Sequence, residues 1–111
     1  MSANIYKIDP KTYELEFEEP DDTIDSLDSL VEELPDNTPR FIILNYPYTA
    51  SDGRPMFPLV LIYYRPSTSR QESKMLYAGC LERFKNEVSP NKFIEIIDED
   101  DFDDLDDRIR N

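Results

Sequence analysis

The sequence contains no histidine, no tryptophan and only one cysteine, Cys80, among its 111 residues. Without histidine, the chain cannot assemble a Ser-His-Asp or Cys-His catalytic centre or a histidine-ligated metal site. A single cysteine allows neither an internal disulfide nor a cluster of thiolate ligands, which indicates a reducing compartment, either the cytosol or the nucleus. We therefore expect no enzymatic activity, no metal site and no cofactor.

Glycine and long apolar runs are also scarce. The two glycines, Gly53 and Gly79, stand apart, so the chain has no glycine-rich loop that could cradle a phosphate. The longest apolar stretch, residues 59–64, is far shorter than the roughly 20 residues that span a bilayer, and no signal segment opens the chain. These features predict a soluble protein without a membrane partner.

Positive charge is the third shortage, because 12 basic residues face 25 acidic ones and leave a net charge of -13. Residues 1–39 and 95–111 are strongly acidic, whereas residues 40–94 carry a small excess of Lys and Arg. Such a chain is repelled by nucleic-acid phosphates and attracted to basic protein surfaces, so we expect no nucleic-acid partner. The aspartates of residues 98–107 lack the EF-hand spacing, and a solvated, acidic helix start explains them. An enzyme with carboxylate-bound Mg²⁺ is an alternative that metal-dependent stabilisation would reveal.

A single globular domain over residues 1–111 fits the length and a hydrophobic fraction of 39%. Alternation of apolar and polar residues predicts a hairpin over residues 4–17, in which Tyr13, Leu15 and Phe17 lie on a buried face. A short helix follows, and its apolar residues keep helical spacing. We expect this helix to begin at a cap formed by Asp25 or Ser26 and to end before Pro35.

Two apolar segments, residues 41–48 and 57–64, predict the central strands of a sheet, joined by a turn at Asp52-Gly53. Their apolar residues are nearly continuous, which implies that helices cover both faces of the sheet. Proline cannot donate a ladder hydrogen bond, so we expect a bulge or frayed strand ends near the turn. The prolines concerned are Pro47, Pro55 and Pro58.

The longest helical pattern runs from Ser69, a candidate N-cap, to Val88. One stripe of this helix is apolar and should face the sheet: Tyr77, Cys80, Leu81, Phe84 and Val88. A short strand over residues 93–97 and a terminal helix with Phe102, Leu105 and Ile109 on one face complete the chain. The predicted order is β-β-α-β-β-α-β-α, an α+β fold with a mixed sheet of about five strands flanked by helices.

A second sector of the long helix carries Met75, Ala78, Gly79 and Glu82. Small residues permit close approach of another backbone, and a methionine beside them forms an adaptable apolar ridge of the kind that docks in a groove of a partner. Alternatively, Met75 packs on a neighbouring loop of its own chain. Spacing alone leaves both interpretations open.

The start of the long helix, Lys74-Met75-Leu76-Tyr77-Ala78, resembles the signature of actin-depolymerising factor homology domains, which have the cofilin-like fold. The closer resemblance is to glia maturation factors, and it extends over residues 3–107. Four segments carry it in order: Pro39-Arg40-Phe41-Ile42, Asp52-Gly53-Arg54, Tyr77-Ala78-Gly79 and Phe93-Ile94-Glu95-Ile96. Gly79 favours this subfamily, since cofilins usually have serine there.

The resemblance implies a monomer that binds the actin-related protein 2/3 complex, inhibits branched actin nucleation and promotes debranching, with actin itself bound weakly. It places the protein in the cytoplasm at the cortical actin cytoskeleton and also in the nucleus. The implied partner-binding residues are Lys74, Met75, Ala78, Gly79 and Glu82 on the long helix, flanked by Asp98, Glu99 and Asp100.

An alternative implied by the same resemblance is direct actin binding of the cofilin type, with filament severing or monomer sequestration. Glu72 opposes it, because cofilins tend to have a basic residue there that complements an acidic actin surface. The chain also lacks the N-terminal helix that covers part of one sheet face in the family. An exposed face, a shifted element, a dimer contact and missing residues are all open explanations.

Overall fold

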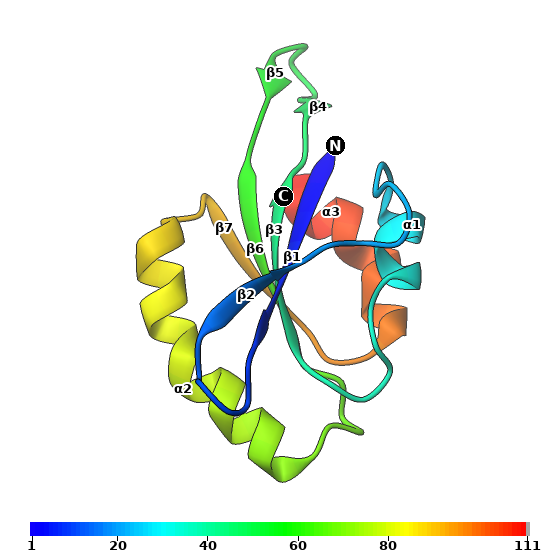
Figure 1. Cartoon of the computed structure of the whole chain (residues 1–111). Helices are drawn as coiled ribbons and strands as arrows, with labels where there is room; N and C mark the ends of the chain where they lie inside the picture. Colours follow the sequence, from blue (N-terminus) through cyan, green and yellow to red (C-terminus); the bar gives the residue numbers. More distant parts are fainter. Residues whose placement is uncertain (111) are drawn as a thin grey trace.

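Five strands form one mixed sheet that lies between helices on both faces (Figure 1). The structure is a computed structural model that describes residues 1–110, apart from the side chain of Glu99. The strands are β1 (Ser2–Ile8), β2 (Leu15–Glu18), β3 (Arg40–Asn45), β6 (Leu59–Tyr64) and β7 (Lys92–Ile96). They lie in the order β2-β1-β3-β6-β7, and only the β6–β7 pair is parallel. This architecture confirms the predicted α+β fold with a five-stranded mixed sheet.

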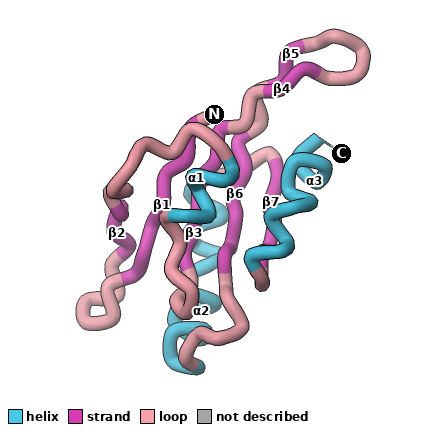
Figure 2. The backbone as a smooth tube through the Cα atoms, turned by 90° about the vertical axis from the view of Figure 1, so that its right-hand side faces the viewer, coloured by secondary structure: helices cyan, strands magenta, loops and turns pink. Residues whose placement is uncertain are grey.

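The helices are distributed unequally over the two faces of the sheet. The short helix α1 (Leu27–Glu32), the 3-10 helix η1 (Glu99–Asp104) and α3 (Leu105–Arg110) lie on one face. The long helix α2 (Gln71–Val88) lies alone on the other face, as the views in Figures 1 and 2 agree. None of the helices in the described part of the chain combines the length and apolar character that crossing a bilayer requires.

Each face of the sheet has its own apolar core, because side chains alternate along β3 and β6. On one face, Ile42, Val60 and Ile62 pack with Leu30 of α1 and Leu105 of α3. On the other face, the aromatic residues of β3 and β6 pack against those of α2: Phe41, Tyr63, Tyr77 and Phe84. Both faces of the central strands are therefore covered, as their continuous apolar pattern predicts.

Two aromatic side chains hold α2 on the sheet. The ring of Phe84 stacks on that of Phe41 with 5.0 Å between centroids. The buried hydroxyl of Tyr77 accepts a hydrogen bond of 2.9 Å from the backbone N–H of Ile8 at the end of β1. This bond satisfies a strand-end donor that would otherwise be costly to bury. The predicted inward stripe of α2 is thereby confirmed.

The capping predictions had different outcomes at the two helices. Ser26 is the N-cap of α1 and forms a reciprocal capping box with Ser29, as predicted. The prediction for α2 was wrong, because Arg70 is its N-cap and makes no side-chain cap hydrogen bond. Ser69 is instead buried one residue earlier, where the chain turns after Pro66 and the Ser69 N–H donates to the Pro66 carbonyl at 3.0 Å.

A narrow arm extends past the edge of the sheet between β3 and β6. Its strands β4 (Tyr48–Thr49) and β5 (Pro55–Met56) pair only with each other and stand clear of the other elements in Figure 1. The turn at its tip uses Gly53 with a φ of +88°, a conformation that side chains disfavour. The expected fraying near the prolines is confirmed, and Phe57, placed in a strand by its sequence, lies outside β6 and is 69% exposed.

The predicted buried face of the N-terminal hairpin was wrong for β2 and the turn before it. Tyr13, Leu15 and Phe17 are 67%, 39% and 53% exposed. The reason is tertiary, because α2 packs on β3 and β6 while α1 joins α3 on the opposite face. Within residues 1–110, no shifted element covers the outer part of the sheet on the α2 side.

Candidate partner-binding surface

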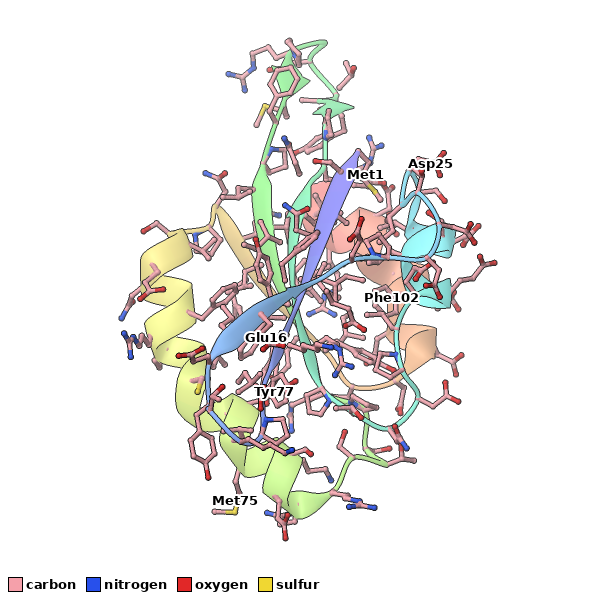
Figure 3. The ribbon with its side chains drawn as sticks, viewed as in Figure 1. Met1, Glu16, Asp25, Met75, Tyr77 and Phe102 are labelled. Atoms are coloured by element: carbon pink, nitrogen blue, oxygen red, sulfur yellow. The ribbon has the colours of Figure 1, made fainter. Side chains whose placement is uncertain are left out.

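The side of α2 that faces away from the sheet forms a continuous exposed strip. We call it the outer α2 surface and define it by Met75, Ala78, Gly79 and Glu82, all of which are exposed. The side chain of Met75 is 66% exposed and, in Figure 3, points away from the sheet, whereas that of Tyr77 points toward it. The interpretation in which Met75 packs on a loop of its own chain is therefore wrong, and the predicted exposed ridge is present.

Gly79 leaves the middle of this surface flat. A Cβ atom added to Gly79 would meet no atom within 4 Å, so packing inside the described chain does not require a glycine there. Glycine in a helix interior costs about 1 kcal/mol relative to alanine. The arrangement favours close approach of another molecule to the backbone of α2.

Lys74 lies beside the outer α2 surface, and its side chain also makes a hydrogen bond within its own chain. Its ammonium donates a hydrogen bond of 3.1 Å to the carbonyl of Ser67, in the loop that precedes α2. The side chain is half-buried, and this contact ties the first turn of the helix to the loop. Lys74 therefore places a basic group at the N-terminal end of the outer α2 surface, and exposed Arg83 adjoins its C-terminal end. Glu72 and Glu82 are acidic and exposed.

The structure brings one of the three predicted acidic residues near the start of α2. Asp98 lines a shallow hollow of about 160 Å³ together with Ser67 and Thr68 of the loop before the helix. Asp100 lies elsewhere, in a groove between η1 and α1 that Asp28 also lines. The side chain of Glu99 is outside the described residues. The predicted flanking of the helix start therefore applies to Asp98 and not to Asp100.

Hydrogen bonds fix the turn in which Asp98 lies. The backbone N–H groups of Asp98 and Ile97 donate to one carboxylate oxygen of Asp101, at 3.2 and 3.1 Å. These bonds lower the pKa of Asp101 below its ordinary value, because they favour its charged form. The segment leading into η1 is thus ordered and negatively charged at neutral pH.

In the part of the chain that the structure describes, no three Cys, Asp or Glu side chains are grouped in a way that could hold a metal ion. The grooves described above are shallow and open to solvent.

Two groups of exposed apolar side chains were not predicted, because the sequence pattern assigned them to buried positions of strands. One is Phe57 on the arm, and the other comprises Leu15 and Phe17 on β2. For Phe57 the signal was available, because Pro55 and Pro58 on either side cannot donate to a strand ladder. For β2 no local signal existed, since its alternation is the same whether its apolar face is covered or bare.

The model of the cofilin/tropomyosin-type actin-binding protein family matches residues 1–110. Protein AIM7 of Saccharomyces cerevisiae is 45% identical over 83 residues, covering 70% of this chain and 56% of the yeast protein. Human glia maturation factor beta is 37% identical over 76 residues, covering 68% of this chain and 54% of the human protein. The chain thus matches little more than half the length of these two relatives.

A solved structure supports the same assignment. The glia maturation factor of Caenorhabditis elegans superimposes with a TM-score of 0.71 and 42% identity, over 88% of this chain and 70% of that one. The fold, the family match over nearly the whole chain and this identity agree with one another. The chain therefore belongs to the cofilin/tropomyosin-type actin-binding protein family and, within it, is similar to glia maturation factors.

Proposed function

We propose that this protein binds the actin-related protein 2/3 complex through the outer α2 surface, inhibits branched actin nucleation and promotes debranching. The observation that carries the proposal is the exposure of Met75, Ala78 and Gly79 on a helix that is firmly packed on its opposite side. Similarity to glia maturation factors supports the choice of partner.

The physical basis is that α2 docks with its outer surface in an apolar groove of the partner. Ala78 and Gly79 carry little or no side chain, so a partner backbone can approach α2 near the lower limit of about 8 Å between helix axes. Met75 supplies a flexible, polarizable side chain that fills an irregular pocket. The resemblance to glia maturation factors implies that this groove is the one at the barbed end of an actin-related subunit.

Direct binding to actin is a second candidate, because the family is described as actin-binding. Glu72, exposed in the first turn of α2, argues against filament binding, since a carboxylate there is repelled by an acidic actin surface. Co-sedimentation with filaments alone separates the candidates. Our proposal expects no appreciable pelleting with filaments, and strong pelleting would favour the cofilin-type alternative.

Replacement of Met75 by aspartate tests the proposed contact. The variant Met75→Asp should bind the complex at least tenfold more weakly than the wild type, because a charge would be desolvated in an apolar groove. The measurement is the number of branches per filament length in fluorescence microscopy, with purified actin, complex and activator. The wild type should reduce this number and the variant should not.

Ser51→Asp is the matched control, since Ser51 is exposed at the turn of the arm, away from α2, and the net charge changes equally. This variant should reduce branching as the wild type does. If Met75→Asp and Ser51→Asp act alike, or if saturating wild-type protein leaves branching unchanged, the proposal fails.

A further inference from the structure

The groove between α1 and η1, on the face of the sheet opposite to α2, has an apolar floor and acidic walls. Its volume is about 450 Å³, and its apolar side chains are those of Leu27, Val31 and Phe102. We call it the α1–η1 groove. The other lining residues are all acidic and exposed: Asp28, Glu32, Asp100 and Asp103.

The spacing of the acidic residues places two of them on each wall. Asp28 and Glu32 are four residues apart in α1 and therefore lie on one side of that helix. Asp100 and Asp103 are three residues apart in η1, and a 3-10 helix has three residues per turn, so they also share a side. A row of carboxylates from each helix thus borders the apolar floor.

Contacts with the core hold the floor in place. Phe102 is buried, and its ring lies 6.2 Å from that of Tyr64 in β6. Leu27 and Val31, four residues apart in α1, pack against the same core but remain only half-buried. These two side chains therefore leave apolar surface accessible between the acidic rows.

The carboxylates of the two walls have no evident role in the stability of the fold. Other acidic residues of the same segments do have one, because Glu18 pairs with Arg40 at 2.7 Å and Asp106 pairs with Arg110 at 2.9 Å. Among the described residues, by contrast, no hydrogen bond or ion pair engages a side chain of the acidic walls. Glu32 also lies in the last turn of α1, where a negative charge is unfavourable for the helix dipole.

The charge around the groove determines which kind of partner fits. Residues 12–39 and 97–107 contain no Lys or Arg and hold 11 and 8 of the 25 acidic residues. The fold brings these distant segments together, because α1 contacts η1 (Figure 1). Such a negative surface repels nucleic acid and attracts lysine and arginine. A second copy of the chain has the same net charge of -13, which opposes self-association.

We propose that the α1–η1 groove binds a short segment of a partner protein that is rich in lysine or arginine and carries aliphatic side chains. The aliphatic side chains pack on Leu27, Val31 and Phe102, and the basic side chains lie against the carboxylates of both walls. Burial of apolar surface stabilises the complex, and the charges provide specificity and a dependence on salt. The groove lies across the sheet from the outer α2 surface, so it is a separate interaction site.

A synthetic peptide serves as the partner segment. It has twelve residues, with two leucines four residues apart, six lysines around them and alanine elsewhere. We expect saturable binding, measured by nuclear magnetic resonance as amide shifts that are largest at Val31, Glu32 and Asp103. The peptide with serine in place of leucine should bind at least fivefold more weakly, because it cannot bury apolar surface. The peptide with glutamate in place of lysine should not bind.

The double variant Glu32→Gln/Asp103→Asn removes one charge from each wall. It should bind the leucine–lysine peptide at least fivefold more weakly than the wild type. Its melting temperature should not fall, because neither carboxylate has a partner in the described part of the chain. Glu14→Gln/Glu87→Gln is the matched control, since both residues are exposed, line a different groove beside α2, and change the net charge equally. The control should bind the peptide within twofold of the wild type.

The proposal is overturned if the serine peptide binds within twofold of the leucine peptide, because the groove would then be only a solvated acidic surface. It is also overturned if the two double variants bind alike, or if the largest amide shifts fall on α2. A dimer in sedimentation that the peptide dissociates would assign the groove to a second copy instead. The assay contains neither actin nor the actin-related protein 2/3 complex, so its outcome is independent of the proposed function.

Discussion

Gly79 illustrates how a single residue on the outer α2 surface balances stability against binding. It lies in the interior of an 18-residue helix, where glycine is unfavourable, and no neighbour in the described chain needs its lack of a side chain. Ala78 beside it is also exposed, so a close approach of a partner would meet two consecutive small residues. If the surface binds a partner as proposed, stability and binding should respond in opposite directions to a methyl group at Gly79.

The variant Gly79→Ala should increase the free energy of unfolding by about 1 kcal/mol, because alanine restricts the unfolded chain and favours the helix. It should at the same time weaken binding to the actin-related protein 2/3 complex several-fold. Urea denaturation and a binding titration measure the two effects. Ala78→Gly is the counterpart, expected to lose about 1 kcal/mol and to keep its affinity. A gain in both stability and affinity for Gly79→Ala would contradict the proposed contact.

At the scale of elements, α3 depends on contacts with the base of the arm. With six residues it is too short to persist alone. Its buried Leu105 and Ile109 pack on the sheet, and its polar side is tied by Asp106, whose carboxylate accepts hydrogen bonds from the Tyr46 hydroxyl and from Arg110. The Arg110 guanidinium also lies 5.0 Å from the ring centre of Tyr48.

These contacts make stability depend on pH. The hydrogen bond from Tyr46, followed by that from Arg110, lowers the pKa of Asp106 below its ordinary value of 3.8. A carboxyl with a lowered folded-state pKa stabilises the fold above its unfolded pKa, and this contribution disappears as the pH falls through the folded pKa.

Asp106→Asn should therefore reduce the free energy of unfolding at pH 7 by about 0.5–1 kcal/mol, a modest value because the carboxylate is partly exposed to solvent. The difference from the wild type should begin to shrink below about pH 4, the pKa of the unfolded carboxyl, and disappear as the pH falls through the lower folded-state pKa. Urea denaturation between pH 7 and pH 3 measures it. Asp107→Asn, an exposed neighbour on α3, should show a smaller difference, and a gap that grows on acidification would refute the assignment.

At the scale of the whole molecule, the central strands are covered on both faces, whereas apolar side chains are exposed at two edges. The strands β3 and β6 are buried on both faces, while β2 and the arm have exposed apolar side chains and few neighbours. Local stability follows the density of buried contacts. We therefore expect β2 and the arm to unfold locally more often than β3 and β6.

Native-state hydrogen exchange should show the slowest amides in β3 and β6 and amides in β2 and the arm that exchange at least a hundredfold faster. Nuclear magnetic resonance at residue resolution measures this. A dilution series serves as the control, because protection of β2 that increases with protein concentration would indicate self-association. Slow exchange in β2 at low concentration would contradict the expected low local stability of this strand.

Most elements of this fold follow from local patterns. The paired runs of apolar residues predicted the central strands, and the spacing of Tyr77, Phe84 and their neighbours predicted the inward face of α2. Asp25 and Ser26 were both recognisable as candidate caps from their residue types, and the structure selects Ser26. Spacing left the position of Met75 open between an exposed ridge and a contact with a loop, and the structure decided for exposure.

The predictions that were wrong concern contacts between distant segments. Ser69 satisfied the sequence rule for a cap, but the loop after Pro66 placed it inside the molecule and left Arg70 at the helix start. The family resemblance grouped Asp100 with Asp98 beside the long helix, yet the two residues line different grooves.

The amino-acid sequence by itself determined most of the strands and helices and their order. Periodicity and capping depend on residues within one or two turns of each other, which explains this success. Only the tertiary structure decided that α1 joins α3 on one face and that β2 keeps its apolar side bare. That choice depends on which helix packs on which face, and the alternation along β2 is identical in either case.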